Sequence, residues 1–369
     1  MAAAFRHFKI MKKKGFKYLD IELTERCNNR CIHCYINQPS DDQNLIRKEM
    51  PTDRVKAILD EAKRTGTKVI RLTGGEPLLR KDFTEIYEYA SGKKFSIRLA
   101  TNGTLMDDRT ADALKKYKPR SVIISLYGWD DASYGRITGN RQGFRMLMSG
   151  LKKLILKNIP FDISLPPLKE LLNHSDKIHA LARSLNAKII EHHTWDLILR
   201  VRREEQLSER IRLLRLHPEE IRNHMARSEN WLRSEKRRFR RQRKTAGTDT
   251  HIFKCAAHRE RATIDACGNL LLCLELRHPA TVYNLKKGSL LDARYSFFPE
   301  LYHIQSGRRI YIERCARCRI RSLCVQCPAT SWVESGILDE PSPYYCKIAH
   351  AEARLLGILS ENENGWDSF

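Results

Sequence analysis

Six short apolar runs alternate with amphipathic helical stretches between residues 18 and 191. The runs are rich in Ile, Leu and Val without regular polar alternation, which is typical of parallel strands covered on both faces. Because crossovers between parallel strands are right-handed, such strand–helix units close naturally into an incomplete barrel. The sequence therefore predicts an α/β fold, a partial (β/α)6 TIM-like barrel. Its strands are expected at residues 18–24, 68–73, 95–101, 121–126, 161–165 and 188–191.

The chain beyond the barrel differs in composition. The stretch from residue 200 to 244 holds 16 basic and 7 acidic residues, with Leu and Ile at helical spacing. Eight of the eleven cysteines follow it, among short strands and turns, which predicts a small domain organised by metal rather than by a large apolar core. The predicted domains are a basic N-terminal segment (1–17), the barrel (18–199), a basic helical linker (200–250), a cysteine-rich domain (251–350) and a tail (351–369).

Charge and cysteine usage restrict the class of protein. The chain has 67 basic and 44 acidic residues, a net charge of +23, which favours an acidic partner. No apolar run reaches the roughly 18 residues of a membrane helix. Residues 1–17 lack the apolar stretch of a secretory signal, although a mitochondrial presequence is a minor alternative. An odd number of cysteines without an export signal disfavours disulfides, so we expect a cytoplasmic protein whose clustered cysteines bind metal.

Three cysteines follow the first predicted strand in the pattern Cys-x-x-x-Cys-x-x-Cys. They are Cys27, Cys31 and Cys34, on a loop over the barrel mouth, where ligands of such barrels gather. Three thiolates can hold a [4Fe-4S] cluster and leave one iron without a protein ligand. The alternatives are a zinc site that lacks one ligand, or a chance spacing.

The sequence Gly74-Gly75-Glu76-Pro77 ends the second predicted strand at the same face. Its glycines let the backbone approach a ligand closely, and a carboxylate beside carbonyls suits an ammonium group, although an ordinary turn is the alternative. One strand–helix unit after the cysteine triad, this segment makes residues 18 to about 200 resemble the radical S-adenosylmethionine (SAM) superfamily.

The resemblance implies reductive cleavage of SAM. The amine and carboxylate of its methionine part bind the open iron, and a 5′-deoxyadenosyl radical abstracts a substrate hydrogen. Gly74, Gly75 and Glu76 would meet the methionine amine. No residue is assigned as catalytic acid or base. The further expected SAM contacts are Asn102 and Ser125 at strand ends, Arg136 for the methionine carboxylate, and His33 near adenine. The alternatives are a glycine turn for Asn102, a strand hydroxyl for Ser125 and a solvated side chain for Arg136.

The C-terminal cysteines resemble the SPASM extension of radical SAM proteins, which binds two auxiliary [4Fe-4S] clusters. One departure is that two residues, not three, separate Cys324 and Cys327, and a zinc ribbon is the alternative for the central run. Three cysteines serve SAM, so eight remain, four for each of two clusters. The resemblance implies Cys255, Cys273 and Cys327 for the first auxiliary cluster, with Cys267 as fourth ligand, and Cys315, Cys318, Cys324 and Cys346 for the second, giving three clusters in all.

Residues 125–144 look most like SPASM oxidoreductases that modify ribosomally made peptides by crosslinking, epimerisation or excision. In sulfatase-maturing members an aspartate directly after the second motif cysteine acts as base. Here Leu274 takes that place and Glu275 follows, and a strand would turn Glu275 to the opposite face, which weakens the sulfatase interpretation. Two further interpretations are a radical SAM enzyme of cofactor biosynthesis and, from a different class, a zinc or nucleic-acid-binding protein.

The expected partners are a precursor peptide and a flavodoxin or ferredoxin-type electron donor. Only about 17 residues precede the first strand, so leader recognition would come from a separate protein or from the basic surface. The stretch 200–244 is interpreted as a solvated linker, or as a docking surface for an acidic peptide. Nucleic-acid binding is the weakest interpretation, because few aromatic residues accompany its arginines.

Overall fold

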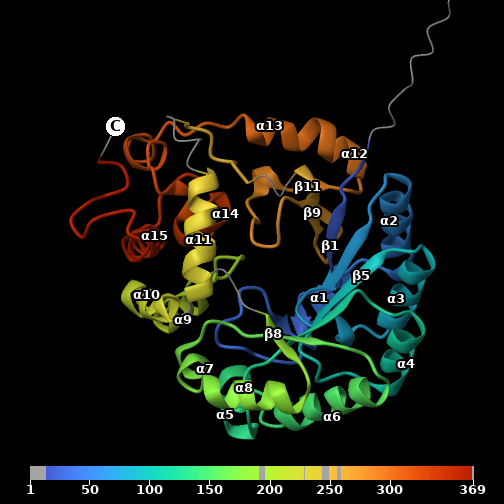
Figure 1. Ribbon diagram of the computed structural model, residues 1–369. Coiled ribbons are helices and arrows are strands. Elements are labelled where there is room, and N and C mark those ends of the chain that lie inside the picture. The colour runs from blue at the N-terminus through green and yellow to red at the C-terminus, as the bar shows by residue number, and fades with distance from the viewer. Residues whose placement is uncertain (1–13, 191–195, 228, 243–248, 256–258, 368–369) are drawn as a thin grey trace, which may run out of the picture.

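The computed structural model describes residues 14–190, 196–227, 229–242, 249–255 and 259–367 (Figure 1). Most of the basic N-terminal segment, Glu191 and Lys244 lie outside these residues. Six parallel strands form the barrel wall in chain order, which confirms the predicted α/β partial barrel. They are β1 (Tyr18–Glu22), β4 (Val69–Thr73), β5 (Ser96–Thr101), β6 (Ser121–Ser125), β7 (Asp162–Ser164) and β8 (Lys188–Ile190).

The inner face of the barrel is polar, contrary to the expectation of strands without alternation. Ile70 and Leu72 of β4 are fully buried, whereas Arg71 between them forms two hydrogen bonds to Asp20 of β1, at 2.9 and 2.8 Å. Arg98 of β5 is the register partner of Arg71 and lies on the same face. The apolar side chains thus face the helices, and the inner face keeps charged groups available to a ligand.

Helices in the stretches between the strands cover the outer face of this sheet (Figure 1). Between β7 and β8 the chain forms two helices rather than one, because the backbone leaves the helical conformation at His174. The helices of the barrel are α1 (Gln43–Lys48), α2 (Thr52–Arg64), α3 (Phe83–Gly92), α4 (Asp108–Lys116), α5 (Asp131–Thr138), α6 (Gly143–Leu156), α7 (Lys169–Asn173) and α8 (Ser175–Ser184).

The C-terminal region continues the barrel sheet. Strand β9 (Arg261–Ile264) pairs in parallel with β1, and β10 (Asn269–Leu271) and β11 (Tyr283–Asn284) follow it in antiparallel pairing. Ile264 and Phe298 belong to the same hydrophobic core as the barrel strands. The expectation that metal rather than an apolar core organises this region is therefore corrected: its first half packs on the barrel. Helices α12 (Leu290–Asp292), α13 (Phe298–Tyr302), α14 (Pro328–Ser335) and α15 (Pro343–Leu355) complete it.

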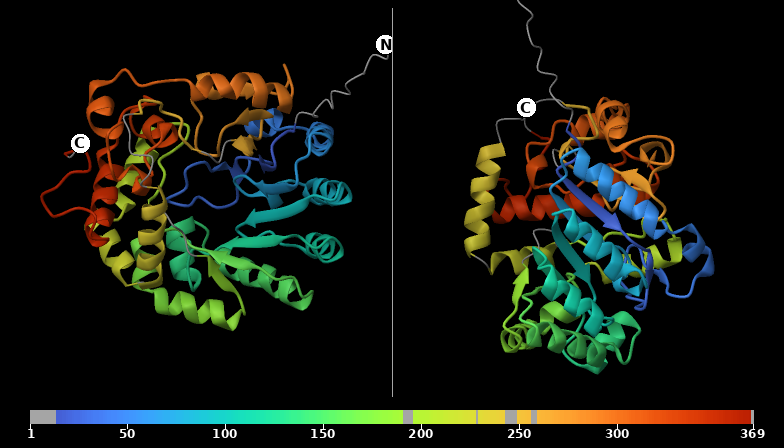
Figure 2. Two further views of the ribbon diagram at one scale, coloured as in Figure 1. Left: turned by 45° about the horizontal axis from the view of Figure 1, so that its top comes forward. Right: turned by 90° about the vertical axis from the view of Figure 1, so that its right-hand side faces the viewer.

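Three helices form the predicted basic linker, α9 (Glu205–Leu214), α10 (Pro218–Ala226) and α11 (Glu229–Gln242). Figures 1 and 2 show them beside the C-terminal region, and α10 packs against α15. In α11, Phe239 is buried, whereas Arg238 bonds Glu235 and the carbonyl of Ser322. Among the described residues, no helix is both long and apolar enough to cross a membrane.

Candidate functional site

The loop that carries the three N-terminal cysteines is fixed over the barrel mouth. Cys27 ends the short strand β2 (Arg26–Cys27), which pairs with β3 (Gln38–Pro39). Main-chain hydrogen bonds join the loop to α5, from Arg30 N to Thr138 O at 2.7 Å and from Ile32 N to Ile137 O at 3.0 Å. The loop is therefore held at both ends and in the middle.

The three thiols of this loop lie close enough to influence one another. Burial raises the pKa of Cys27 to about 12, and the charges of Glu76 and Cys34 add to this effect. Burial, then Cys34 and Cys27, also raise the pKa of Cys31. Backbone N–H groups of Asn29 and Asn37 donate to the sulfurs of Cys27 and Cys34, both at 3.4 Å. Clustered thiolates with N–H donors require a cation, so this donor set fits an iron–sulfur cluster.

Within the described ranges, no three His, Cys, Asp or Glu side chains are arranged around one point as ligands of a single metal ion. A [4Fe-4S] cluster binds each thiolate through a different iron, whereas a structural zinc gathers four ligands on one ion.

The Gly74-Gly75-Glu76 segment runs beside the start of the cysteine loop. Gly75 N donates to Thr24 O at 2.7 Å, and Glu76 N donates to Arg26 O at 2.9 Å. A Cβ on Gly74 would lie 2.1 Å from Thr24 O, and one on Gly75 would lie 2.3 Å from Arg26 O. The glycines are thus required by this close backbone approach.

The Glu76 carboxylate is fully buried and already occupied. It accepts hydrogen bonds from Thr101 Oγ1 at 2.6 Å, Asn102 N at 2.7 Å and Leu78 N at 3.0 Å. Burial raises the pKa of Glu76 to about 7 against these hydrogen bonds. This carboxylate joins strand ends β4 and β5 and does not point freely at a ligand.

Asn102 connects β5 to the cysteine loop. Its Nδ2 donates to Asn28 Oδ1 at 2.9 Å and lies 3.7 Å from Cys27 Sγ. Its Oδ1 accepts from Thr104 N and Thr104 Oγ1. The side chain that was expected to contact SAM therefore orients the loop and the Cys27 sulfur.

His33 and Ser125 meet at Tyr127. The centroid of the His33 ring lies 5.4 Å from that of the Tyr127 ring, and the Ser125 side chain is among the groups close enough to influence the Tyr127 phenol. Burial lowers the pKa of His33 to about 4, so the ring is neutral, and within the described residues its Nδ1 has no hydrogen-bond partner. Two expected SAM contacts are thus brought together beside the cysteine loop.

Arg136 is not brought to this group. On α5 its side chain is 58% exposed and forms an ion pair with Glu170 of α7, with Nε 3.1 Å from Oε1. Its assignment to the methionine carboxylate stays a prediction, and it requires this ion pair to open.

Arg200 is a site residue that the sequence did not identify. It is 1% exposed and donates to Cys34 O, Asn37 O and Asn37 Oδ1, each at 2.9 Å, and to both oxygens of Glu204. Val201 N donates to Tyr35 O at 3.0 Å. In the sequence Arg200 stands at the start of the basic linker, and in a run of arginines no local signal distinguishes a buried one.

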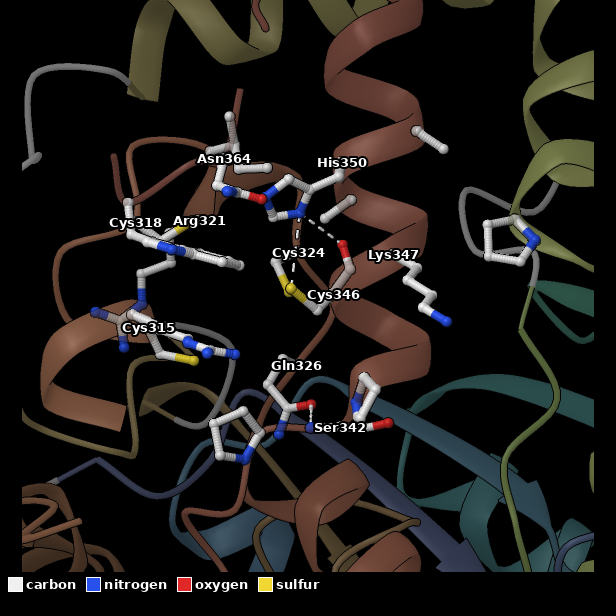
Figure 3. Close-up of a pocket in the computed structure, with 18 of the residues that line it drawn as sticks. Cys315, Cys318, Arg321, Cys324, Gln326, Ser342, Cys346, Lys347, His350 and Asn364 are labelled. Carbon is white, nitrogen blue, oxygen red and sulfur yellow. Dashed lines mark hydrogen bonds between the residues drawn. The ribbon is translucent and has the colours of Figure 1, made fainter. Parts of the chain in front are cut away.

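Four C-terminal cysteines surround one cavity of about 540 Å³ (Figure 3). Burial raises the pKa of Cys324 far above that of a free thiol, and the negative charges of the Cys346, Cys315 and Cys318 thiolates raise it further. Arg314, Arg321 and Lys347 line the same cavity. The four cysteines predicted for the second auxiliary cluster, Cys315, Cys318, Cys324 and Cys346, are thus neighbours, in a setting with compensating positive charge.

The other predicted group is only partly assembled. Burial raises the pKa of Cys273 and of Cys327. The charge of Glu275 raises both values further, and that of Cys327 adds to the effect on Cys273. Burial also raises the pKa of Glu275 to about 7. Cys267 instead has Asp265, Glu25 and Arg202 among its strongest charged neighbours. Cys255 is exposed and lies at the edge of a part of the chain outside the described residues.

Comparison with known proteins identifies the barrel. Residues 21–173 match the radical SAM superfamily. An AdoMet-dependent heme synthase of Methanosarcina barkeri is 29% identical over 48% of this chain and 49% of its own length. A probable GTP 3′,8-cyclase of Methanocaldococcus jannaschii is 34% identical over 47% and 53%. The heme synthase of Oleidesulfovibrio alaskensis is 25% identical over 87% and 85%. The chain spans about half or less of the first curated relatives it matches.

Solved structures share the fold beyond the barrel. Streptococcus suis SuiB bound to its precursor peptide SuiA superimposes with a TM-score of 0.62, at 16% identity, over 90% of this chain and 76% of that one. Native anSMEcpe with bound AdoMet gives 0.57, at 16% identity, over 92% and 96%. The cysteine-rich C-terminal region agrees with the SPASM resemblance. Through its barrel and its cysteine loop, the chain contains a radical SAM domain, which the family match places at residues 21–173.

Proposed function

We propose that this radical SAM enzyme modifies a peptide, as a maturase of ribosomally made peptides does. The radical SAM part of the proposal rests on the meeting of Cys27, Cys31 and Cys34 at the mouth of a polar barrel, with Asn102 directed at the Cys27 sulfur. The fold shared with SuiB, which was solved with a precursor peptide, supports a peptide as the substrate class.

In this proposal Cys27, Cys31 and Cys34 hold a [4Fe-4S] cluster and leave one iron for SAM. When bound, the cluster would supply the electron that cleaves SAM to methionine and a 5′-deoxyadenosyl radical. Because the Glu76 oxygens already accept three hydrogen bonds, we assign the methionine amine to the main chain of Gly74 and Gly75.

Neutral His33 and Tyr127 would give the adenine a surface on which to pack, and Ser125 would lie at its edge. Asn102 would keep the Cys27 sulfur in place through its contact with the loop.

The C-terminal cysteines would hold two auxiliary clusters. Those around the cavity supply the second, while Cys273 and Cys327 begin the first, with Cys255 and Cys267 as the other two ligands. Reconstitution should then give about twelve irons per chain. The Cys267→Ala variant should bind about four irons fewer. An unchanged iron content would mean that Cys267 is not a cluster ligand and keeps its place beside Glu25 and Arg202 in the parent protein.

The exposed arginines of α11 would attract an acidic leader peptide or a separate recognition protein. The reducing electron would come from a flavodoxin or ferredoxin-type donor. Long-range attraction of this kind increases the rate of encounter and is weakened by salt.

A second candidate is cofactor biosynthesis on a porphyrin. It is favoured by the relation to a heme synthase along 87% of the chain. Arg71 and Arg98 on the inner face could bind the carboxylates of such a substrate. Another curated relative is named Fe-coproporphyrin III synthase, which supplies a defined compound to test.

One experiment separates these candidates. The reconstituted protein is reduced anaerobically with SAM, and 5′-deoxyadenosine is measured alone, with short acidic peptides encoded beside the gene, and with Fe-coproporphyrin III. Peptide modification predicts a mass change in one peptide and none in the porphyrin. A changed porphyrin with unchanged peptides would overturn the peptide assignment, and absence of 5′-deoxyadenosine under all conditions would overturn the assignment of the cluster residues.

A further inference from the structure

Residues 361–367, beyond α15, form one wall of the cavity that the four cysteines line. Asn364 and Trp366 line it directly, and Figure 3 shows Asn364 next to His350 and on the same side as Cys318. Arg319 N donates to Gly365 O at 2.8 Å, and the Arg319 guanidinium pairs with the Glu363 carboxylate. The segment is therefore fastened to the loop that carries Cys318.

His350 joins the same segment to Cys346. Its Nδ1 lies 2.8 Å from Cys346 O and 3.6 Å from Cys346 Sγ, and its Nε2 accepts from Gly365 N at 3.0 Å. Since one ring nitrogen faces a carbonyl and the other an N–H group, these contacts require the neutral tautomer with hydrogen on Nδ1. Trp366 packs on the ring, with centroids 5.1 Å apart, and the Arg314 guanidinium lies 5.2 Å over the indole.

Gly365 lies directly on Cys318. A Cβ at this position would be 2.6 Å from Cys318 Sγ and 2.7 Å from Ile320 Cγ1. Gly365 is not among the glycines with positive φ, so the backbone conformation does not itself require a glycine. The close approach to the sulfur requires it, because any side chain would lift the segment from the cavity.

We propose that residues 361–367 are a closed strap that keeps water and dioxygen from a cluster held by Cys315, Cys318, Cys324 and Cys346, with Gly365 and His350 as its positioning residues. The inference rests on the proposed function, which assigns the second auxiliary cluster to these cysteines. Solvent exposure and hydrogen bonds to sulfur are among the factors that set the potential of such a cluster, so the strap also adjusts its redox behaviour.

The test measures how fast each cysteine is released. The reconstituted full chain is exposed to an iron chelator, pulsed with iodoacetamide and mapped by mass spectrometry. Gly365→Ala and a truncation after Ser360 should each label Cys318 and Cys346 about tenfold faster than the parent, which equals about 1.4 kcal/mol of opening free energy. Gly307→Ala is the matched control, because its Cβ would meet nothing within 4 Å, and it should label at the parent rate.

A second measurement excludes a general loss of stability. Labelling of Cys27, Cys31 and Cys34 should stay at the parent rate in the strap variants. The midpoint potential of one cluster should rise while the others stay fixed, because water stabilises the more highly charged reduced form.

Three results would overturn the strap: parent labelling rates at Cys318 in both variants, an equal increase at all cysteine groups, or potentials that do not change. If the parent binds no iron, the proposed function fails, and the labelling of Cys318 in the metal-free chain still decides whether the segment covers it.

Discussion

Arg200→Lys tests whether the barrel-mouth loop depends on a residue of the linker boundary. The Arg200 guanidinium makes five hydrogen bonds to Cys34, Asn37 and Glu204. A lysine keeps the charge but loses the planar fork, so about three of these bonds are lost. Hydrogen bonds from a charged donor contribute about 1.5–3 kcal/mol each, and those within one network are not additive.

We therefore expect a loss of about 2–4 kcal/mol in the free energy of unfolding, less than the sum of three bonds. Glu204 is 33% exposed and is partly solvated after the change, which lowers the cost. A domain with a free energy of unfolding of about 5–15 kcal/mol stays folded after such a loss. Because the lost contacts end on Cys34 O and Asn37, the cluster nearest SAM should suffer first.

The measurements are chemical unfolding of the metal-free chain, and iron content with electron paramagnetic resonance after reconstitution. The signal that changes on adding SAM should fall, while the auxiliary signals persist. Arg212→Lys is the control. Within the described part of the chain the Arg212 side chain bonds the exposed Glu205 and Glu209, so this substitution should cost about 0–1 kcal/mol. Equal stability and equal SAM-dependent signals in both variants would refute the role of Arg200.

Three further predictions concern the cluster ligands, a buried carboxyl group and the basic helix. Cys31→Ala should abolish 5′-deoxyadenosine formation and leave about eight irons, and unchanged cleavage would contradict the ligand assignment. Burial, and then the charge of Glu235, raise the pKa of Glu352 to about 7, so folding takes up a proton and the free energy of unfolding should fall as the pH rises from about 4.5 to about 7. Glu352→Gln should remove this pH dependence and stabilise the chain at pH 8 by up to about 3 kcal/mol, which unfolding measurements at several pH values would check. Replacing Arg237, Arg240 and Arg241 by Glu should weaken acidic-peptide binding and its salt dependence while SAM cleavage without peptide stays the same; affinity indifferent to both would make α11 a plain linker.

The barrel could be predicted from sequence because its strands and helices are encoded locally. Apolar runs of four to seven residues and amphipathic stretches between them located all six strands to within a few residues. The polar inner face was overlooked, since isolated charged residues such as Asp20 and Arg71 do not interrupt an apolar run. Its meaning depends on closure of the sheet, which is not a local property.

The candidate site was predictable only where spacing carries chemistry. The cysteine triad and the Gly-Gly-Glu-Pro segment have fixed short spacings, and the structure places them side by side. Asn28, Arg200 and Gly365 have no such signal, because each acts through a partner more than 40 residues away in the chain. Pairing across such distances is a property of the folded chain.

The same long-range contacts show how the two cysteine regions are connected. Arg200 holds the loop of Cys27, Cys31 and Cys34, and the helices that follow it lead to α11. There Arg238 bonds Glu235 and the carbonyl of Ser322, two residues before Cys324. The basic stretch therefore has one anchor beside each group of cysteines, and the exposed Arg237, Arg240 and Arg241 lie on either side of the anchor at Arg238. A partner that binds these arginines would contact a segment attached to both cysteine regions, whereas a freely solvated linker would need neither anchor. These two anchors, at buried Arg200 and at the partly exposed Arg238, thus favour a docking role for α11 over that of a spacer.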